Sequence, residues 1–250
     1  MIIPNWAGGA PANVGALTTL RQGGVSFAPY DDGVGGGGLN LGMHVGDRLE
    51  SVQQNRALLR AFLPAEPAWL TQVHGTKVVD AAAIKKAAPE ADASIATQPG
   101  VVCVIQTADC LPVLFCDLAG NVVGAAHAGW RGLAQGVLEN TIAAMRAAGA
   151  GEIMAWLGPA IGPLRFEVGA EVLNVFITRN PGASAAFQPV ADHPGKYLAD
   201  LYQLARLLLT KAGIHRISGG GFCTMQDRHR FYSYRRDNIT GRMASLIWIK

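Results

Sequence analysis

The sequence predicts an α/β or α+β layered sandwich in which a mixed central β-sheet is flanked by helices. Short apolar runs rich in Val, Leu and Ile alternate with longer segments whose apolar residues recur at helical spacing. Half of the 250 residues are hydrophobic, which is enough for a sizeable core. The chain contains no internal repeat and no linker-like segment. We therefore expect a single domain over residues 1–250.

The first half of the chain supplies most of the expected strands. Residues 18–26 and 72–79 have strand-like patterns, with a glycine-rich loop over 31–38 and a helix over 50–62 between them. Three short apolar runs follow, and we expect them to be buried central strands because they lack polar alternation. These three runs cover residues 101–106, 112–116 and 122–127.

The second half supplies most of the helices. A helix is predicted over 132–147 because Leu133, Val137, Leu138, Ile142 and Met145 recur at helical spacing. A strand is expected over 153–157, and another over 245–249 closes the chain. Helices are expected over 169–178 and 200–211, the second with leucines on one face.

Composition argues against several classes of partner. The net charge is only +3, and the 21 basic residues are scattered, so the basic stripe typical of nucleic-acid binding is absent. No apolar run reaches the roughly 18 residues of a membrane helix, and the N-terminus lacks a basic and then apolar leader. Four cysteines are too few for a disulfide framework. We expect a cytoplasmic protein with no nucleic-acid or membrane partner.

Three metal-capable side chains lie at the borders of apolar segments. They are His74, Cys110 and His127. Imidazole nitrogen and thiolate sulfur both suit zinc, and three protein ligands leave the fourth tetrahedral position open for water or substrate. The sequence therefore offers His74, Cys110 and His127 as a catalytic zinc site.

Other interpretations of these residues stay open. A single histidine at a strand end is more often a hydrogen-bonded core residue, and cysteine is among the most buried residue types. We assign Cys103 and Cys116 to the core for this reason. Cys110 beside an imidazole is also a candidate nucleophile of an amide or ester hydrolase. A fourth ligand, Cys223 or His229, would instead close a structural zinc site in a binding module.

The segment 127–132 also has features of an anion site. It leads from a strand into a helix, so unpaired backbone N–H groups face the strand end. Gly129 would let an anion approach this backbone closely, and Arg131 could donate a charge-assisted contact to phosphate or carboxylate. Arg131 is equally well explained as a surface residue of the first helical turn.

Seven ordered motifs resemble a family of bacterial laccase-domain proteins, also called polyphenol oxidases or peptidoglycan editing factors, with a purine nucleoside phosphorylase activity attributed to it. The matching segments extend through most of the chain. They are RQGGVS at 21–26, LNLGMHVGD at 39–47, QVHG at 72–75, ADCLP at 108–112, HAGWRG at 127–132, GPAIGP at 158–163 with FEVG at 166–169, and FYSYRRD at 231–237 with TGR at 240–242.

The resemblance implies a set of site residues. The family's metal ligands fall on His74, Cys110 and His127, with zinc as the expected ion and copper as an alternative. The arginine of the first motif, Arg21, is associated with activity in the family and is expected to be catalytic together with the three ligands. Asn40 and His44 would belong to the rim of the same pocket and, with Gly129 and Arg131, contact substrate or phosphate.

The resemblance also implies a reaction. It predicts a zinc-dependent purine nucleoside phosphorylase acting on adenosine, inosine, guanosine and S-methyl-5'-thioadenosine, with adenosine deaminase activity. The expected partners are therefore a purine nucleoside and phosphate. The alternatives are a Cys-His amide hydrolase that edits peptidoglycan precursors and a copper-dependent polyphenol oxidase, or laccase. The sequence does not determine the preferred substrate, the oligomeric state or the roles of Cys223 and Arg236.

Overall fold

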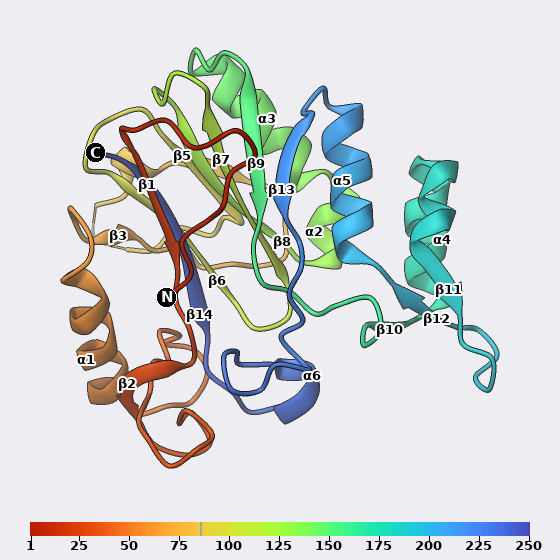
Figure 1. Cartoon of the computed structure of the whole chain (residues 1–250), viewed down its shortest axis with the longest axis horizontal. Helices are drawn as coiled ribbons and strands as arrows, with labels where there is room; N and C mark the ends of the chain where they lie inside the picture. Colours follow the sequence, from red (N-terminus) through yellow and green to blue (C-terminus); the bar gives the residue numbers. More distant parts are fainter. Residues whose placement is uncertain (86) are drawn as a thin grey trace.

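Two facing β-sheets form the centre of the structure, a computed structural model that describes residues 1–85 and 87–250 (Figure 1). The smaller of the two has four strands, mostly antiparallel, and joins the two ends of the chain because β1 pairs with β14. In order across the sheet its strands are β1 (Val14–Thr18), β14 (Met243–Ile249), β6 (Val102–Thr107) and β3 (Pro67–Ala68).

The second sheet has six strands and carries two of the predicted metal ligands near one end. It is mixed, since β4 pairs with β5 and β9 with β13 in parallel while the other pairs are antiparallel. In order its strands are β13 (Arg216–Gly219), β9 (Ile153–Leu157), β7 (Leu111–Asp117), β8 (Val123–Ala128), β5 (Ala93–Ala96) and β4 (Val78–Asp80).

Three apolar cores divide the molecule into four layers. Cys103, Ile105 and Ile247 of the four-stranded sheet pack with Leu114 and Trp156 of the six-stranded sheet to form the central core. The helix α1 (Leu49–Arg60) covers the outer face of the four-stranded sheet, and α2 (Trp130–Gln135), α3 (Val137–Ala147) and α5 (Leu201–Lys211) cover that of the six-stranded sheet.

A small lobe extends beyond α5 at one end of the molecule (Figure 1). Its elements are the antiparallel strands β10 (Glu167–Gly169), β12 (Lys196–Ala199) and β11 (Phe187–Pro189), the helix α4 (Ala170–Arg179) and the 3-10 helix η2 (Pro181–Ala186). The short strand β2 (Gln22–Ser26), the 3-10 helix η1 (Ala81–Ala83) and the helix α6 (Tyr234–Asp237) complete the chain.

The predicted fold class is confirmed, but the arrangement of the sheet and three segments differ in detail. The single central sheet is two facing sheets and a small third one. The strand predicted over 18–26 is interrupted between β1 and β2, where Arg21 donates its backbone N–H to Arg230. The helix predicted over 132–147 breaks at Gly136, whose φ of +105° ends α2 in a left-handed cap. In the segment 72–79 only the last residues, from Val78, form a strand.

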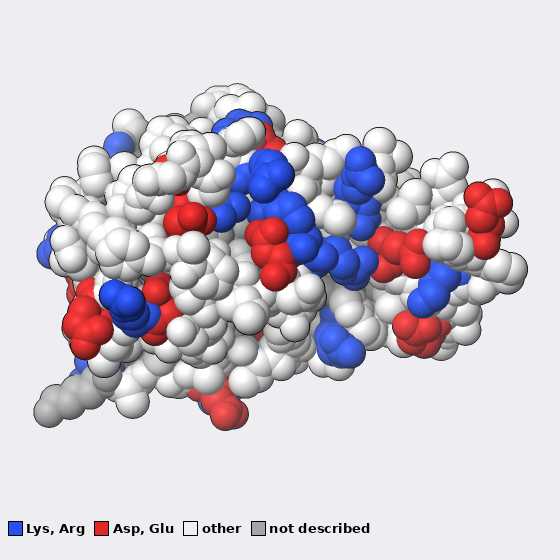
Figure 2. All heavy atoms as spheres, turned by 90° about the horizontal axis from the view of Figure 1, so that it is seen from below, with Lys and Arg blue, Asp and Glu red and all other residues white. Residues whose placement is uncertain are grey.

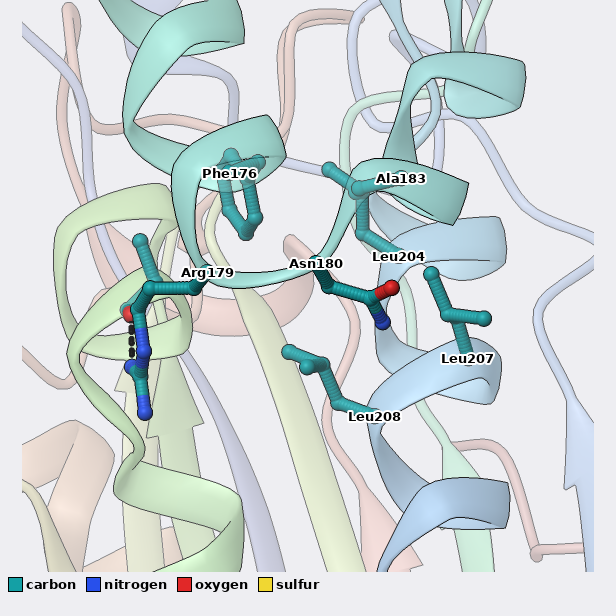
Figure 3. A pocket seen from close by; sticks show the side chains of 8 residues that line it. Phe176, Arg179, Asn180, Ala183, Leu204, Leu207 and Leu208 are labelled. Atoms are coloured by element: carbon teal, nitrogen blue, oxygen red, sulfur yellow. Dashed lines mark hydrogen bonds between the residues drawn. The ribbon is translucent and has the colours of Figure 1, made fainter.

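A small apolar hollow lies between α4 and α5 (Figure 3). Its volume is about 10 Å³, roughly the space of one water molecule. Its polar lining residues are Asn180 and Arg179, and Arg179 donates a hydrogen bond to the carbonyl of Ala134 near the end of α2. The hollow is too small for a metabolite. None of the described helices is long and apolar enough to cross a membrane.

Candidate metal centre and its cavity

The three predicted ligands meet at one end of the six-stranded sheet. Cys110 directly precedes β7, and His127 lies near the end of the antiparallel neighbour β8, opposite Pro112. His74 comes from the irregular segment before β4, where its φ of +61° turns the chain sharply. The donor atoms of the three side chains all lie within 4.8 Å of one another.

This spacing fits a tetrahedral ion. Bonds of about 2.3 Å to sulfur and about 2.0 Å to nitrogen separate two donors by roughly 3.5 Å. The Sγ of Cys110 lies 3.7 Å from Nε2 of His74. Among the described residues this is the group of three or more His, Cys, Asp or Glu side chains that could hold a metal, and neither Cys223 nor His229 belongs to it.

Gly129 lies next to the cluster, where its lack of a side chain leaves room for two of the three side chains. A Cβ at this position would lie 2.9 Å from Cδ2 of His74 and 3.0 Å from Sγ of Cys110. Real Cβ atoms are seldom this close to other heavy atoms, so the backbone of Gly129 keeps the space that the two ligands need. The residues present therefore fit a bound divalent ion.

Substituting Gly129→Ala is expected to weaken metal binding while leaving the fold intact. The added methyl group would push the His74 ring and the Cys110 thiolate apart and would not disturb the core between the sheets. We expect an affinity loss of about 10-fold or more, as for other changes that misplace metal ligands. Titration of the metal-free protein with Zn²⁺ measures it. Gly151→Ala, where a Cβ meets nothing within 4 Å, is the control.

Asp92 connects two of the ligand segments and was not predicted from the sequence. Its carboxylate is fully buried, and Oδ1 lies 2.8 Å from Nδ1 of His127. The same carboxylate accepts backbone N–H groups from Val73, His74 and Gly75 at 3.2, 2.9 and 2.7 Å. Asp92 thus fixes the sharp turn at His74 and directs Nε2 of His127 towards the cluster.

The charges of the cluster are strongly coupled. Burial opposes ionisation of Cys110, but the adjacent His127 and His74 more than offset it and lower the pKa of the thiol to about 6. Burial likewise opposes protonation of His127, yet the Cys110 thiolate and Asp92 raise the pKa of the imidazole to about 9. At neutral pH the metal-free site therefore holds a thiolate, which is the form of cysteine that ligates metals.

Two further contacts fix the backbone around Cys110 and His74. The Gln72 side chain exchanges two hydrogen bonds of 2.8 Å with the backbone of Gln106 in β6. Asp109 has a φ of +90°, a conformation uncommon outside glycine. Its carboxylate accepts the hydroxyl of Thr224 at 2.6 Å and the backbone N–H of Arg235 at 2.6 Å, which holds this strained turn in place.

A cavity of about 730 Å³ opens beside the cluster, which is ample for a small metabolite. The three ligands form one wall. The other walls mix aromatic, amide and cationic side chains and, over the described part of the chain, include no carboxylate. The polar and aromatic members are His44, Arg56, Trp69, Thr71, Gln72, Gln106, Thr107, Tyr234 and Arg242.

Of the other predicted site residues, His44 lines this cavity. Gly129 is not among the lining residues and lies next to His74 and Cys110. Asn40 is fully buried outside the lining, where its side chain bonds Asp47 and the backbone N–H of Arg242. Asn40 thus supports Arg242, which lines the cavity.

Arg21 and Arg131 are not among the residues that line the cavity. Arg21 is buried and pairs with Asp31 at 3.0 Å, with its guanidinium 5.2 Å from the ring centre of Tyr232. Arg131 is exposed and stacks on Trp130. Their catalytic and phosphate-binding roles remain predictions.

The other three cysteines and Arg236 lie outside the metal cluster. Cys103 and Cys116 are fully buried, which confirms their assignment to the core. Cys223 lines a separate cavity and accepts the N–H of Gly162 at 3.2 Å. Arg236 ties the C-terminal segment together by bonding the carbonyls of Thr224, Met225 and Phe231, which is a structural role.

Comparisons with known proteins identify the family of this chain. A family model described as multi-copper polyphenol oxidoreductase laccase matches residues 15–250. The chain belongs to this family. A relative in the laccase family, named purine nucleoside phosphorylase, from Pseudomonas aeruginosa is 51% identical over 249 residues and covers 100% of this chain and 98% of its own. The relative named purine nucleoside phosphorylase YfiH from Escherichia coli is 51% identical over 251 residues, with the same coverage.

Solved structures of laccase-family relatives share the fold over nearly the whole chain. A crystal structure of a Neisseria meningitidis protein superposes with a TM-score of 0.91 at 50% identity, covering 100% of this chain and 98% of the other. A Bacillus licheniformis protein titled hypothetical protein YfiH superposes with a TM-score of 0.83 at 31% identity, covering 95% and 93%. The resemblance stated from the motifs is thereby confirmed.

Proposed function

We propose that this chain is a metal-dependent purine nucleoside phosphorylase of the laccase family, acting in the cytoplasm on adenosine, inosine, guanosine and S-methyl-5'-thioadenosine, with adenosine deaminase activity. The observation that carries the proposal is the 730 Å³ cavity whose wall is the cluster of His74, Cys110 and His127. Two relatives that are 51% identical over the whole of this chain are named purine nucleoside phosphorylase. The cavity is large enough for a nucleoside together with phosphate.

The chain's own residues account for binding and orientation. His74, Cys110 and His127 would hold the ion, with zinc as the proposed occupant and copper as the alternative. When bound, the ion would supply Lewis acidity and ionise water near neutral pH, which is the chemistry that deamination of adenosine needs. Trp69 offers an aromatic face, and Gln72 and Gln106 place amides along the same cavity. These groups suit a flat purine with polar edges.

Phosphorolysis needs a different contribution from the protein. Negative charge develops on the departing purine, and fixed donors and cations stabilise such charge most in a site that excludes water. Arg242 and Tyr234 line the cavity next to the cluster and can supply these donors. Which residues serve each of the two reactions depends on where phosphate binds.

The test is an assay of the purified protein with each nucleoside and inorganic phosphate. Ribose 1-phosphate and free base are expected as products, together with inosine when the substrate is adenosine, and removal of the metal by a chelator is expected to stop turnover. A protein that retains its metal but consumes no nucleoside would refute the proposal. Formation of ribose 1-phosphate without inosine would refute the deaminase part alone.

A second candidate is a Cys-His amide hydrolase acting on peptidoglycan precursors. The observation that favours it is the sequence of contacts from Cys110 through His127 to Asp92, together with the lowered pKa of the thiol. Such an arrangement activates a cysteine nucleophile. Hydrolysis of a muropeptide amide by the metal-free protein would support this candidate, since a bound ion would occupy the sulfur.

Copper-dependent oxidation of phenols is the third candidate. The family model is described by that activity, and two imidazoles with one thiolate also suit copper. Oxygen consumption with a phenolic substrate, measured on the copper-loaded and zinc-loaded protein, separates this candidate from the phosphorylase.

A further inference from the structure

Two arginines and a histidine form a row that lines the cavity of the metal centre. Burial lowers the pKa of Arg242, and the negative charge of Cys110 partly offsets this effect, so Arg242 lies within electrostatic reach of the cluster. Burial lowers the pKa of His44, and the positive charges of Arg242 and Arg56 lower it further. All three side chains line the same cavity. Arg242 is thus the member of this row whose charge interacts with Cys110, and His44 lies within electrostatic range of both arginines.

Arg242 is held rigidly, with one edge of its guanidinium free. Its Nη1 donates to the carbonyls of Thr240 and Gly241 at 2.9 and 3.1 Å. Its backbone N–H donates to Oδ1 of the buried Asn40 at 2.9 Å, and its Cγ lies so near Gly42 that a Cβ there would come within 2.8 Å. Over residues 1–85 and 87–250, no protein acceptor bonds its Nε or Nη2.

Arg56 has fewer guanidinium nitrogens free to bind a ligand. Its Nε and Nη2 both donate to the carbonyl of Leu41 at 3.0 and 2.9 Å. Its guanidinium also stacks on Trp69, 3.7 Å from the ring centre. Arg56 therefore contributes positive charge to the row, while Arg242 has donors available.

The surroundings favour an anion at this position. None of the described residues that line the cavity is a carboxylate; the negative charges that act on the arginines are those of Cys110 and Asp109 on Arg242 and that of Glu66 on Arg56. The helix α6, whose Tyr234 also lines the cavity, lies at the lower edge of the molecule in Figure 1. The face seen from below carries a band of Lys and Arg side chains with Asp and Glu among them (Figure 2). A tetrahedral oxyanion can accept two parallel N–H bonds from an arginine edge.

We infer that the free edge of Arg242, with His44 beside it, binds the phosphate co-substrate between the metal centre and Arg56. This inference rests on the proposed phosphorylase function. An oxygen of hydrogen phosphate forms a bond to C1′ of the ribose while the bond from C1′ to the purine nitrogen breaks. The electron pair of the broken bond stays on the purine, whose nitrogen takes up the proton of hydrogen phosphate. Arg242 holds the phosphate and does not exchange protons.

The experiment compares Arg242→Met with Arg131→Met and Arg216→Met in the metal-loaded protein. Arg131 is the competing phosphate ligand that the sequence suggests. Arg216 is an exposed arginine of β13. Its strand partner is Met154, which in turn lies opposite Cys116, so Arg216 lies at the other end of the six-stranded sheet from Cys110. For each variant the KM for phosphate and the KM for inosine are measured separately, and inorganic phosphate is titrated directly by calorimetry.

Arg242→Met is expected to raise the KM and the dissociation constant for phosphate by about 10- to 100-fold, the range for loss of charge-assisted hydrogen bonds. The KM for inosine should change by less than about threefold, within the usual context dependence of such effects. Arg242→Lys, which keeps the charge but not the forked geometry, should lie between the wild type and Arg242→Met. Arg216→Met should match the wild type.

Two results would overturn the inference. One is a folded Arg242→Met protein with unchanged phosphate affinity, and the other is a rise in the phosphate KM caused by Arg131→Met in place of Arg242→Met. If Arg242→Met does not fold, Arg242→Lys and His44→Asn decide the matter by the same measurements. Wild type that binds phosphate at Arg242 but forms no ribose 1-phosphate would refute the proposed function and leave the anion site standing.

Discussion

Cys110→Ser is expected to remove the bound metal and to reduce nucleoside phosphorolysis by more than about 100-fold, the upper range for changes that only disturb a ligand's supports. The physical reason is charge. The thiol has a pKa of about 6 in this site and ligates as an anion at neutral pH, whereas a serine hydroxyl stays protonated. His127, whose pKa of about 9 depends partly on that thiolate, also loses its partner. Metal content per chain and product formation measure the two losses.

Cys223→Ser is the matched control for this substitution. Cys223 is half-buried like Cys110 but lines a different cavity. We expect it to keep the wild-type metal content and activity. Loss of metal in Cys223→Ser would support a closed structural site with a fourth protein ligand. Full phosphorolysis by the metal-free Cys110→Ser protein would show that the cluster is not the reactive centre.

The central strands could be predicted from the sequence because they are buried on both faces. The predicted runs at 101–106, 112–116, 122–127 and 153–157 match β6, β7, β8 and β9 to within one residue at each end. Their assignment to sheets could not be predicted. β6 and β7 are separated only by residues 108–110, yet they belong to different sheets. The strained turn at Asp109 makes this crossing, and Thr224, far along the chain, stabilises it.

The three candidate metal ligands can be predicted from motifs, whereas the residues that support them depend on the tertiary structure. Asp92 stands between two alanines, and nothing local distinguishes it from a loop acid. Glu90, two residues earlier, shares the neighbour Ala91, so the local sequence gives no signal that selects Asp92. Arg242 belongs to a recognised motif, but its place beside Cys110 arises because the last strand, β14, pairs with β6. Such neighbours are set by strand pairing over long sequence separations.

Asp92→Asn is expected to weaken metal binding by about 10- to 100-fold, as for other residues that orient a metal-binding histidine. One carboxylate accepts the His127 ring N–H and three backbone N–H groups around His74. An asparagine has one oxygen acceptor, and its NH₂ group would face N–H donors. The His74 turn and the His127 tautomer both lose their support. Zn²⁺ titration of the metal-free variant measures the effect.

Asp117→Asn is the matched control, because it separates positioning from stability. Asp117 is also buried and accepts two backbone N–H groups, from Asn121 and Val122, but it lies at the far end of β7 from Cys110. Asp92→Asn should lower the free energy of unfolding by about 1–3 kcal/mol, the cost of unsatisfied buried donors, whereas the amide oxygen in Asp117→Asn can still accept both backbone N–H groups. Only Asp92→Asn should change the zinc affinity. Equal zinc affinities in the two variants would show that Asp92 is merely structural.

The pH dependence of stability gives an independent check on Asp92 in the metal-free protein. Burial alone would raise the pKa of Asp92, but hydrogen bonds from His127, Gly75 and Val73 hold it below the usual value of 3.8. The resulting stabilisation is present above pH 3.8 and is lost as the pH falls through the lower folded-state pKa. The stabilisation from protonated His127 is complete below pH 6.5 and is lost as the pH rises through about 9. Urea unfolding should therefore show the largest difference between wild type and Asp92→Asn from pH 3.8 to pH 6.5, and this difference should shrink as the pH rises through about 9, where His127 loses its proton.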